Sequence, residues 1–135
     1  MADGPIKTPI GTAWMDAEGI LWHLLDDRVS VSGSLAQSTA EVLREVLADR
    51  PAPAIVDITN LSFADEEAQD IFARLASAAP EVATAVLLRA GDNHVPSMIA
   101  YFFSKLEADR PIAFFDNEHA AVAWTRRFIK VAPSV

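Results

Sequence analysis

The sequence contains no cysteine and no long uncharged apolar run, and each absence excludes a class of protein. Without cysteine, the chain of 135 residues cannot form disulfides, thiolate metal sites or a cysteine nucleophile. No uncharged run reaches the roughly 18 residues of a membrane-spanning helix, so we expect no membrane span. An apolar share of 51% with 22% charged residues instead indicates a folded globular domain.

Basic residues are also scarce, and the formal net charge is −8. A chain of this charge would repel a phosphate backbone, so we expect no nucleic-acid partner. The N-terminal residues Met1–Gly11 include an early acid and no apolar core, unlike a signal peptide. Together with the lack of cysteine, this predicts a cytoplasmic protein.

The motifs of common catalytic sites are missing as well. The sequence has no G-x-G-x-x-G or G-x-x-x-x-G-K-[ST] phosphate loop and no G-x-S-x-G nucleophile elbow. None of the three histidines, His23, His94 and His119, has a second histidine at metal-ligand spacing. We therefore predict that the chain is not an enzyme, with no catalytic residue, metal or cofactor.

Apolar periodicity predicts strands that alternate with helices. Gly11–Asp16 and Ile20–Leu25, separated by a turn at Gly19, read as an antiparallel hairpin. Val29 and Val31 either extend its second strand or belong to the following loop. Further strands are predicted at about 54–58, 82–88 and 112–115, and helices at about 34–48, 65–76, 93–106 and 117–128, with Ser34 as a candidate N-cap of the first.

This order of elements predicts one α/β domain with a mainly parallel sheet. The N-terminal hairpin adds an antiparallel part, and the helices pack on the sheet. We assign the domain to residues 11–130, with a flexible arm at 1–10 and a short tail at 131–135.

The stretch Ala54–Glu67 is the most promising place for a site, because a buried strand there runs into an acidic helix start. Asp57 lies near the carboxyl end of the strand, where α/β proteins place their sites. It could instead hydrogen-bond the backbone of the following turn. The candidate partner-binding surface comprises Asp57, Thr59, Asn60, Ser62, Asp65, Glu66, Glu67 and Asp70.

The acidic residues of this stretch have two readings. Carboxylates could hold a hard cation, but helical geometry leaves only Glu66 and Asp70 on one face. Interaction with the helix dipole, worth about 0.3–1 kcal/mol per residue, explains them better.

Large apolar side chains are in surplus near the C-terminus. They could form a subunit interface, most simply of a homodimer, or a pocket for an apolar small molecule or lipid. The dimer is the preferred reading. The candidates are Met98, Tyr101, Phe102, Phe103 and Trp124.

The order of elements and the segment AIVDITNLSFADEEAQDIF resemble the STAS family of anti-sigma-factor antagonist-like domains, and in particular the divergent SpoIIAA-like (STAS/SEC14-type) proteins of unknown function. The pattern is matched at Asp57, Thr59, Phe63 and Asp65. In typical members, a D-S-[ST]-G sequence opens the next helix, and a hydroxyl there is phosphorylated by a partner kinase. This chain has Glu66, Glu67 and Ala68 in place of hydroxyl, hydroxyl and glycine.

The resemblance implies a SpoIIAA-like fold without the phosphoacceptor, since glutamate has no hydroxyl to accept a phosphoryl group. A fixed carboxylate carries about one charge, less than the −1.5 to −2 of phosphoserine. The first hypothesis is therefore a non-catalytic interaction or regulatory module that binds a protein partner or itself. The alternative is a carrier of a small apolar molecule or lipid, with its pocket near the Met98–Phe103 helix.

Overall fold

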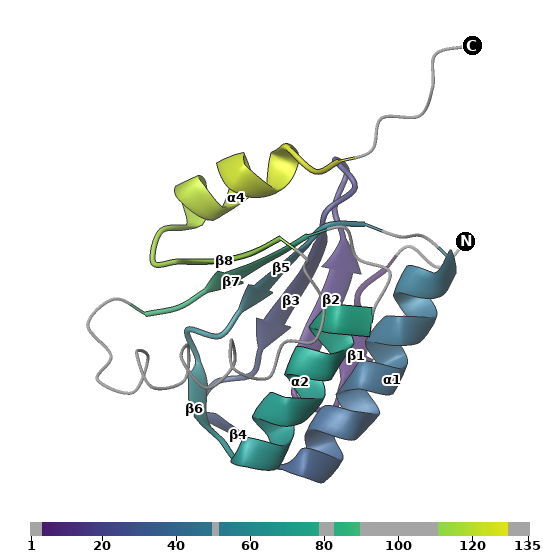
Figure 1. Ribbon diagram of the computed structural model, residues 1–135, viewed down its shortest axis with the longest axis vertical. Helices are drawn as coiled ribbons and strands as arrows, with labels where there is room; N and C mark the ends of the chain where they lie inside the picture. The colour runs from purple at the N-terminus through teal and green to yellow at the C-terminus, as the bar shows by residue number, and fades with distance from the viewer. Residues whose placement is uncertain (1–3, 50–51, 79–82, 90–110, 130–135) are drawn as a thin grey trace.

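The computed structural model describes residues 4–49, 52–78, 83–89 and 111–129 (Figure 1). The helix predicted at 93–106 and the tail at 131–135 lie outside these residues. The helices are α1 (Gly33–Asp49), α2 (Glu66–Ala78) and α4 (Glu118–Arg126). The strands are β1 (Ile6–Thr8), β2 (Gly11–Met15), β3 (Leu21–Leu25), β4 (Val29–Val31), β5 (Ala54–Asp57), β6 (Leu61–Ala64), β7 (Thr84–Leu87) and β8 (Ile112–Phe115).

Six strands form one mixed sheet in the order β1-β2-β3-β5-β7-β8. The pairs β1/β2 and β2/β3 are antiparallel, and β3/β5, β5/β7 and β7/β8 are parallel. Strands β4 and β6 make a separate parallel pair. The predicted mainly parallel α/β sheet with an N-terminal antiparallel hairpin is confirmed.

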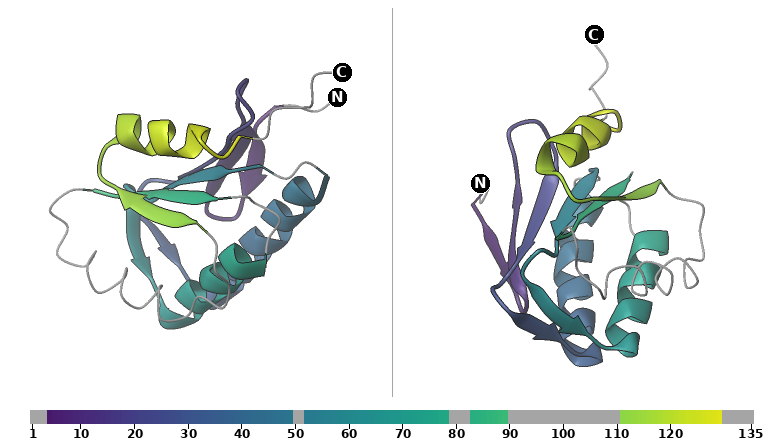
Figure 2. Two further views of the ribbon diagram at one scale, coloured as in Figure 1. Left: turned by 45° about the horizontal axis from the view of Figure 1, so that its top comes forward. Right: turned by 90° about the vertical axis from the view of Figure 1, so that its left-hand side faces the viewer.

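Side chains of the central strand β5 alternate between two cores, as the pleat of a strand requires. Ala54 packs with Leu43 and Leu47 of α1, whereas Ile55 packs with Ala121 of α4. Helices α1 and α2 lie side by side on the face of the sheet to which Ala54 points (Figures 1 and 2). An apolar strand covered on both faces is typical of parallel sheets.

Two local predictions need correction. Residues 6–10 are not a loose arm, because Ile6–Thr8 forms the edge strand β1 and Ile10 is buried. Strand β1 has only three residues, too few to show the alternation of apolar and polar side chains that indicates a strand in the sequence. Its strand conformation comes from pairing with β2. The N-cap of α1 is Ser32 rather than Ser34, since the Leu35 amide donates to Ser32 Oγ at 3.4 Å.

A buried histidine ties β1 to β3. His23 is 2% exposed, and its Nε2 lies 3.0 Å from Thr8 Oγ1. The Thr8 hydroxyl also accepts the Ile10 amide at 3.4 Å, which leaves its proton to donate to the ring. Burial lowers the pKa of His23 to about 4, against the opposing attraction of Asp26. The neutral imidazole is therefore part of the folded core, and His23 has a structural role.

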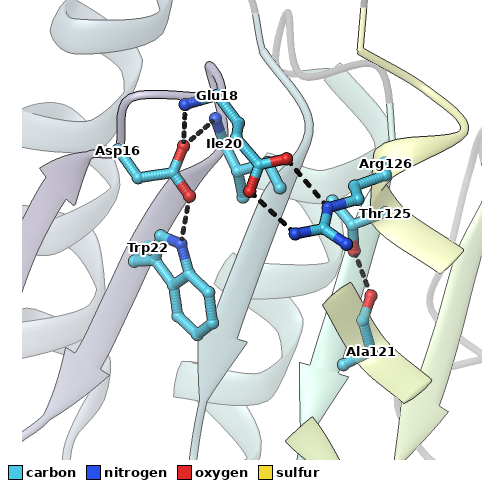
Figure 3. A network of polar contacts seen from close by, with 7 residues as sticks. All are labelled: Asp16, Glu18, Ile20, Trp22, Ala121, Thr125 and Arg126. Carbon is cyan, nitrogen blue, oxygen red and sulfur yellow. Dashed lines mark hydrogen bonds and ion pairs between the residues drawn. The ribbon is translucent and has the colours of Figure 1, made fainter. Parts of the chain in front are cut away.

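A polar network joins the β2–β3 turn to α4 (Figure 3). Asp16 Oδ1 accepts the Glu18 and Ile20 amides at 2.9 and 3.0 Å, and its Oδ2 accepts Trp22 Nε1 at 2.8 Å. Glu18 pairs with Arg126 of α4 through two contacts of 2.8 and 3.1 Å, and this raises the pKa of the guanidinium. The turn thus fixes an indole ring and meets the last turn of α4.

We predict that His23 makes the fold sensitive to mild acid. Its pKa is lower in the folded than in the unfolded chain, so protons favour unfolding as the pH falls from about 6.5 to about 4. The loss should reach about 3 kcal/mol of unfolding free energy, measured by urea denaturation across this pH range. His23→Gln should flatten this part of the profile, whereas substitution of the exposed His119 by Gln should not. Parallel profiles for the wild type and His23→Gln would contradict the assignment.

A second prediction separates the two parts of the turn network. Asp16→Ala leaves three donors without their acceptor and should lower the unfolding free energy by about 1–3 kcal/mol. Glu18→Ala removes only a solvent-exposed ion pair and should cost clearly less. Denaturant titration of both variants provides the comparison, and an equal loss would contradict the prediction, because the exposed ion pair would then contribute as much as the turn.

Candidate functional site

The end of β5 is shaped by Asp57, whose role was left open by the sequence. Its Oδ1 accepts the Thr59 amide at 2.9 Å and the Thr59 hydroxyl at 2.6 Å. This is the local hydrogen bonding by which aspartate stabilises a turn. The structure therefore gives Asp57 the turn-forming role.

The same turn is held from both sides. The Thr59 carbonyl accepts Arg89 Nη2 at 2.8 Å, from the end of β7. Asn60 Nδ2 donates to the Leu25 carbonyl at 3.3 Å, at the end of β3. Contacts to both neighbouring strands make the turn a firm base for the segment that follows.

Strand β6 follows the turn and exposes a phenylalanine. In the register with β4, Phe63 stands opposite the exposed Ser30, while Val31 and Ala64 face the core between α1 and α2. Phe63 is 62% exposed, compared with 38% for Leu24, the other exposed large apolar residue of the described chain. An aromatic side chain of this exposure on a short strand is a candidate for partner contact.

The sequence analysis did not include Phe63 in the candidate surface, because it predicted a turn and a helix here rather than a strand. Strict alternation would place Leu61 and Phe63 on the same face of a strand. The ladder between β4 and β6 shifts between Val29 and Ser30, and Leu61 is half-buried while Phe63 is exposed. The signal that separates them is therefore a tertiary one.

The start of α2 adds fixed negative charge beside this strand. Asp65 Oδ1 accepts the Ala68 amide at 2.7 Å, so Asp65 is the N-cap. Glu66 and Glu67 are exposed in the first turn, where carboxylates interact favourably with the helix dipole. Asp70 lies one turn further along and is half-buried.

Glu67 also reaches the start of α1. A side-chain carbon added to Gly33 would overlap the Glu67 carboxyl group. The first turn of α1 contains no acid of its own, so Glu67 supplies a carboxylate to its positive end. Two helix N-termini therefore lie near one carboxylate, and a larger residue at position 33 would displace the Glu67 side chain from its present position.

The predicted surface thus splits into two parts. Asp57, Thr59, Asn60, Asp65 and Asp70 are half-buried, and the first four have local structural bonds. Ser62, Glu66 and Glu67 are exposed. With Phe63 they form what we call the Phe63 surface: Ser62, Phe63, Glu66 and Glu67.

Of the residues predicted to form the aromatic interface or pocket, the structure describes only Trp124. Met98, Tyr101, Phe102 and Phe103 lie outside the described residues. Trp124 is half-buried, and its ring centroid lies 5.8 Å from that of Phe115 and 4.8 Å from that of Phe128. The choice between interface and pocket stays a prediction.

The described part of the chain holds no group of three or more histidine, cysteine, aspartate or glutamate side chains arranged for a metal ion. Within the same ranges, no helix is both long and apolar enough to cross a membrane.

Comparison with solved structures supports the fold. The chain is similar to an uncharacterized protein of the DUF3478 family from Shewanella loihica PV-4, described as having a SpoIIAA-like fold. The two share 16% identity over 90% of each chain, with a TM-score of 0.55. At this identity the likeness shows the fold alone, which is SpoIIAA-like.

Sequence comparison assigns the family. No curated protein matches the chain. A family profile described as a domain of unknown function (DUF7793) matches residues 13–129, which include every described element from β3 to α4 and most of β2. The chain therefore belongs to this family, DUF7793.

Proposed function

We propose that this chain is a non-catalytic interaction module that binds a protein partner through the Phe63 surface. The observation that carries the proposal is the 62% exposure of Phe63 on a strand where Leu61 is half-buried and Ala64 is buried. Burying such a ring against a partner gains apolar contact without breaking any contact of the core.

The charges around the ring indicate what kind of partner fits. Glu66 and Glu67 stand at the start of α2, directly after the strand that carries Phe63. A complementary protein would offer an apolar pocket bordered by lysine or arginine. The net charge of −8 would steer such a basic partner towards the chain.

The same residues support a surface that is not switched by phosphorylation at the helix start. Glu66 and Glu67 occupy the positions of the two hydroxyl residues in the D-S-[ST]-G sequence of typical STAS domains, so the negative charge here is permanent. A regulatory role would then depend on the partner's availability rather than on modification of this helix. A cytoplasmic location belongs to the same proposal and is supported by the absence of cysteine.

We predict that Phe63→Ser abolishes most partner binding without unfolding the protein. Loss of a central aromatic contact typically costs at least about 2 kcal/mol, or roughly thirtyfold in affinity. The measurement is affinity capture from lysate of the native host, quantified by mass spectrometry, followed by titration of the purified partner. Phe63→Leu, which keeps an apolar contact, should retain most of the binding.

The charged part of the surface has a matched control. Glu66→Lys combined with Glu67→Lys should reduce capture and make the residual binding less salt-dependent. Glu41→Lys combined with Glu45→Lys makes the same charge change at exposed positions of α1 and should leave capture unchanged. Unchanged recovery with both Phe63→Ser and the Glu66/Glu67 reversal would refute the proposed surface.

A further inference from the structure

Among the described residues, no helix covers β1 and β2 on the side away from α1 and α2, whereas Trp22 of β3 packs at the edge of the core beneath α4. Successive side chains of a strand point to opposite sides of the sheet. Ala13 of β2 and Leu21 of β3 pack against α1, so the residues that follow them, Trp14 and Trp22, point to the other side. Leu24, two residues after Trp22, points to that side as well. Helix α4 packs on the same side but over β5, β7 and β8. Within the described ranges, no helix covers this side of β1 and β2 (Figure 2).

The side chains on this face are uncharged, and Leu24 is exposed while Thr12, Trp14 and Trp22 are half-buried. The rings of Trp14 and Trp22 are cross-strand partners and stack with centroids 6.1 Å apart and planes within 3°. The bond from Trp22 Nε1 to Asp16 fixes the orientation of the second ring. Thr12 and Leu24 are paired in the next row, and Leu24 is 38% exposed. We call Thr12, Trp14, Trp22 and Leu24 the tryptophan face.

The row that contains Leu24 ends in opposite charges. Strand pairing aligns Lys7 with Thr12, Thr12 with Leu24, and Leu24 with Asp57, across β1, β2, β3 and β5. Directly paired residues on adjacent strands project to the same side of a sheet. A cation and an anion therefore border the tryptophan face, at roughly equal distances from its centre.

We propose that a second copy of this chain docks on the tryptophan face, with a two-fold axis parallel to the strands. Such an axis reverses the order of residues along each row. It creates two symmetric contacts, each between Lys7 of one copy and Asp57 of the other. It also brings Trp14 of each copy towards Trp22 of the other copy. Leu24 then meets Thr12, so the face is complementary to itself, as a two-fold interface requires.

The two charged residues are available for this contact. Lys7 Nζ has only long contacts, 3.5 Å to Thr12 Oγ1 and 3.9 Å to Asp26 Oδ1, and its side chain is 72% exposed. Thr59 uses Oδ1 of Asp57, which leaves the second carboxylate oxygen to face a partner. Two copies with a net charge of −8 repel each other, so they associate best through an uncharged face with such pairs at its borders.

The size of the face sets the expected strength. From Lys7 on β1 to Asp57 on β5 there are three strand spacings of about 4.8 Å, and a strand of five residues is about 17 Å long, so the face spans roughly 14 by 17 Å. Interfaces of this extent belong to the small class, whose complexes are weak. The dimer should therefore form in the micromolar to millimolar range rather than at nanomolar concentration.

Sedimentation velocity from about 5 µM to about 1 mM tests the dimer. The wild type should shift from monomer to dimer across this range, and Leu24→Asp, which places a charge at the centre, should weaken association at least tenfold. Lys7→Glu and Asp57→Lys should each weaken it separately. An equimolar mixture of these two variants should associate again, because every mixed pair contains one native and one sign-exchanged contact.

Controls keep the test decisive. Glu45→Lys makes the same charge change as Asp57→Lys on the exposed side of α1 and should leave association unchanged. Because Asp57 also holds its turn, Asp57→Asn, which retains an acceptor for Thr59, should weaken association without lowering the unfolding midpoint. Three results would overturn the proposal: a monomer at every concentration, a dimer insensitive to Leu24→Asp, or a mixture that associates no better than its components. None of them would affect the Phe63 surface, which lies on a different strand pair.

Discussion

The whole structure depends on strand β5, which is hydrogen-bonded on both edges and covered on both faces. Its four residues pair with β3 and β7, and its alternate side chains enter two separate cores. Because its backbone is hydrogen-bonded on both edges and its side chains pack into a core on each face, the strand has little freedom to shift register. Everything that follows Asp57, including the turn, β6 and the start of α2, inherits a fixed position from it.

Most of the fold could be predicted from the sequence, because most helices and strands are indicated by residues close together in the sequence. The apolar run Ala54–Ile58 predicts a buried strand, and Asp65 before two glutamates predicts a helix start. The capping contact of Asp65 and that of Asn117, whose Oδ1 accepts the Ala120 amide at 3.0 Å, follow directly from such local chemistry. Local signals succeed wherever residues close in sequence satisfy one another.

The candidate site was harder to predict for the opposite reason. Strands β4 and β6 have three and four residues and pair with each other across the whole of α1 and β5. The exposure of Phe63 depends on a register shift in the β4–β6 ladder, which leaves no trace in the local sequence. The family resemblance includes Phe63 as a match to the pattern, but it does not place its ring on an exposed surface. Chemistry that comes from long-range pairing appears only in the folded chain.

The position of Gly33 has a consequence for how this surface would respond to a partner. The Glu67 carboxyl group occupies space that any other residue at position 33 would fill, and it serves the N-termini of two helices at once. A lysine or arginine that approached Glu67 would compete with α1 for the same carboxylate. Contact on α2 would then change the electrostatic balance at the start of a neighbouring helix. A docking contact at Glu67 and the electrostatics at the start of α1 would in this way depend on the same carboxylate.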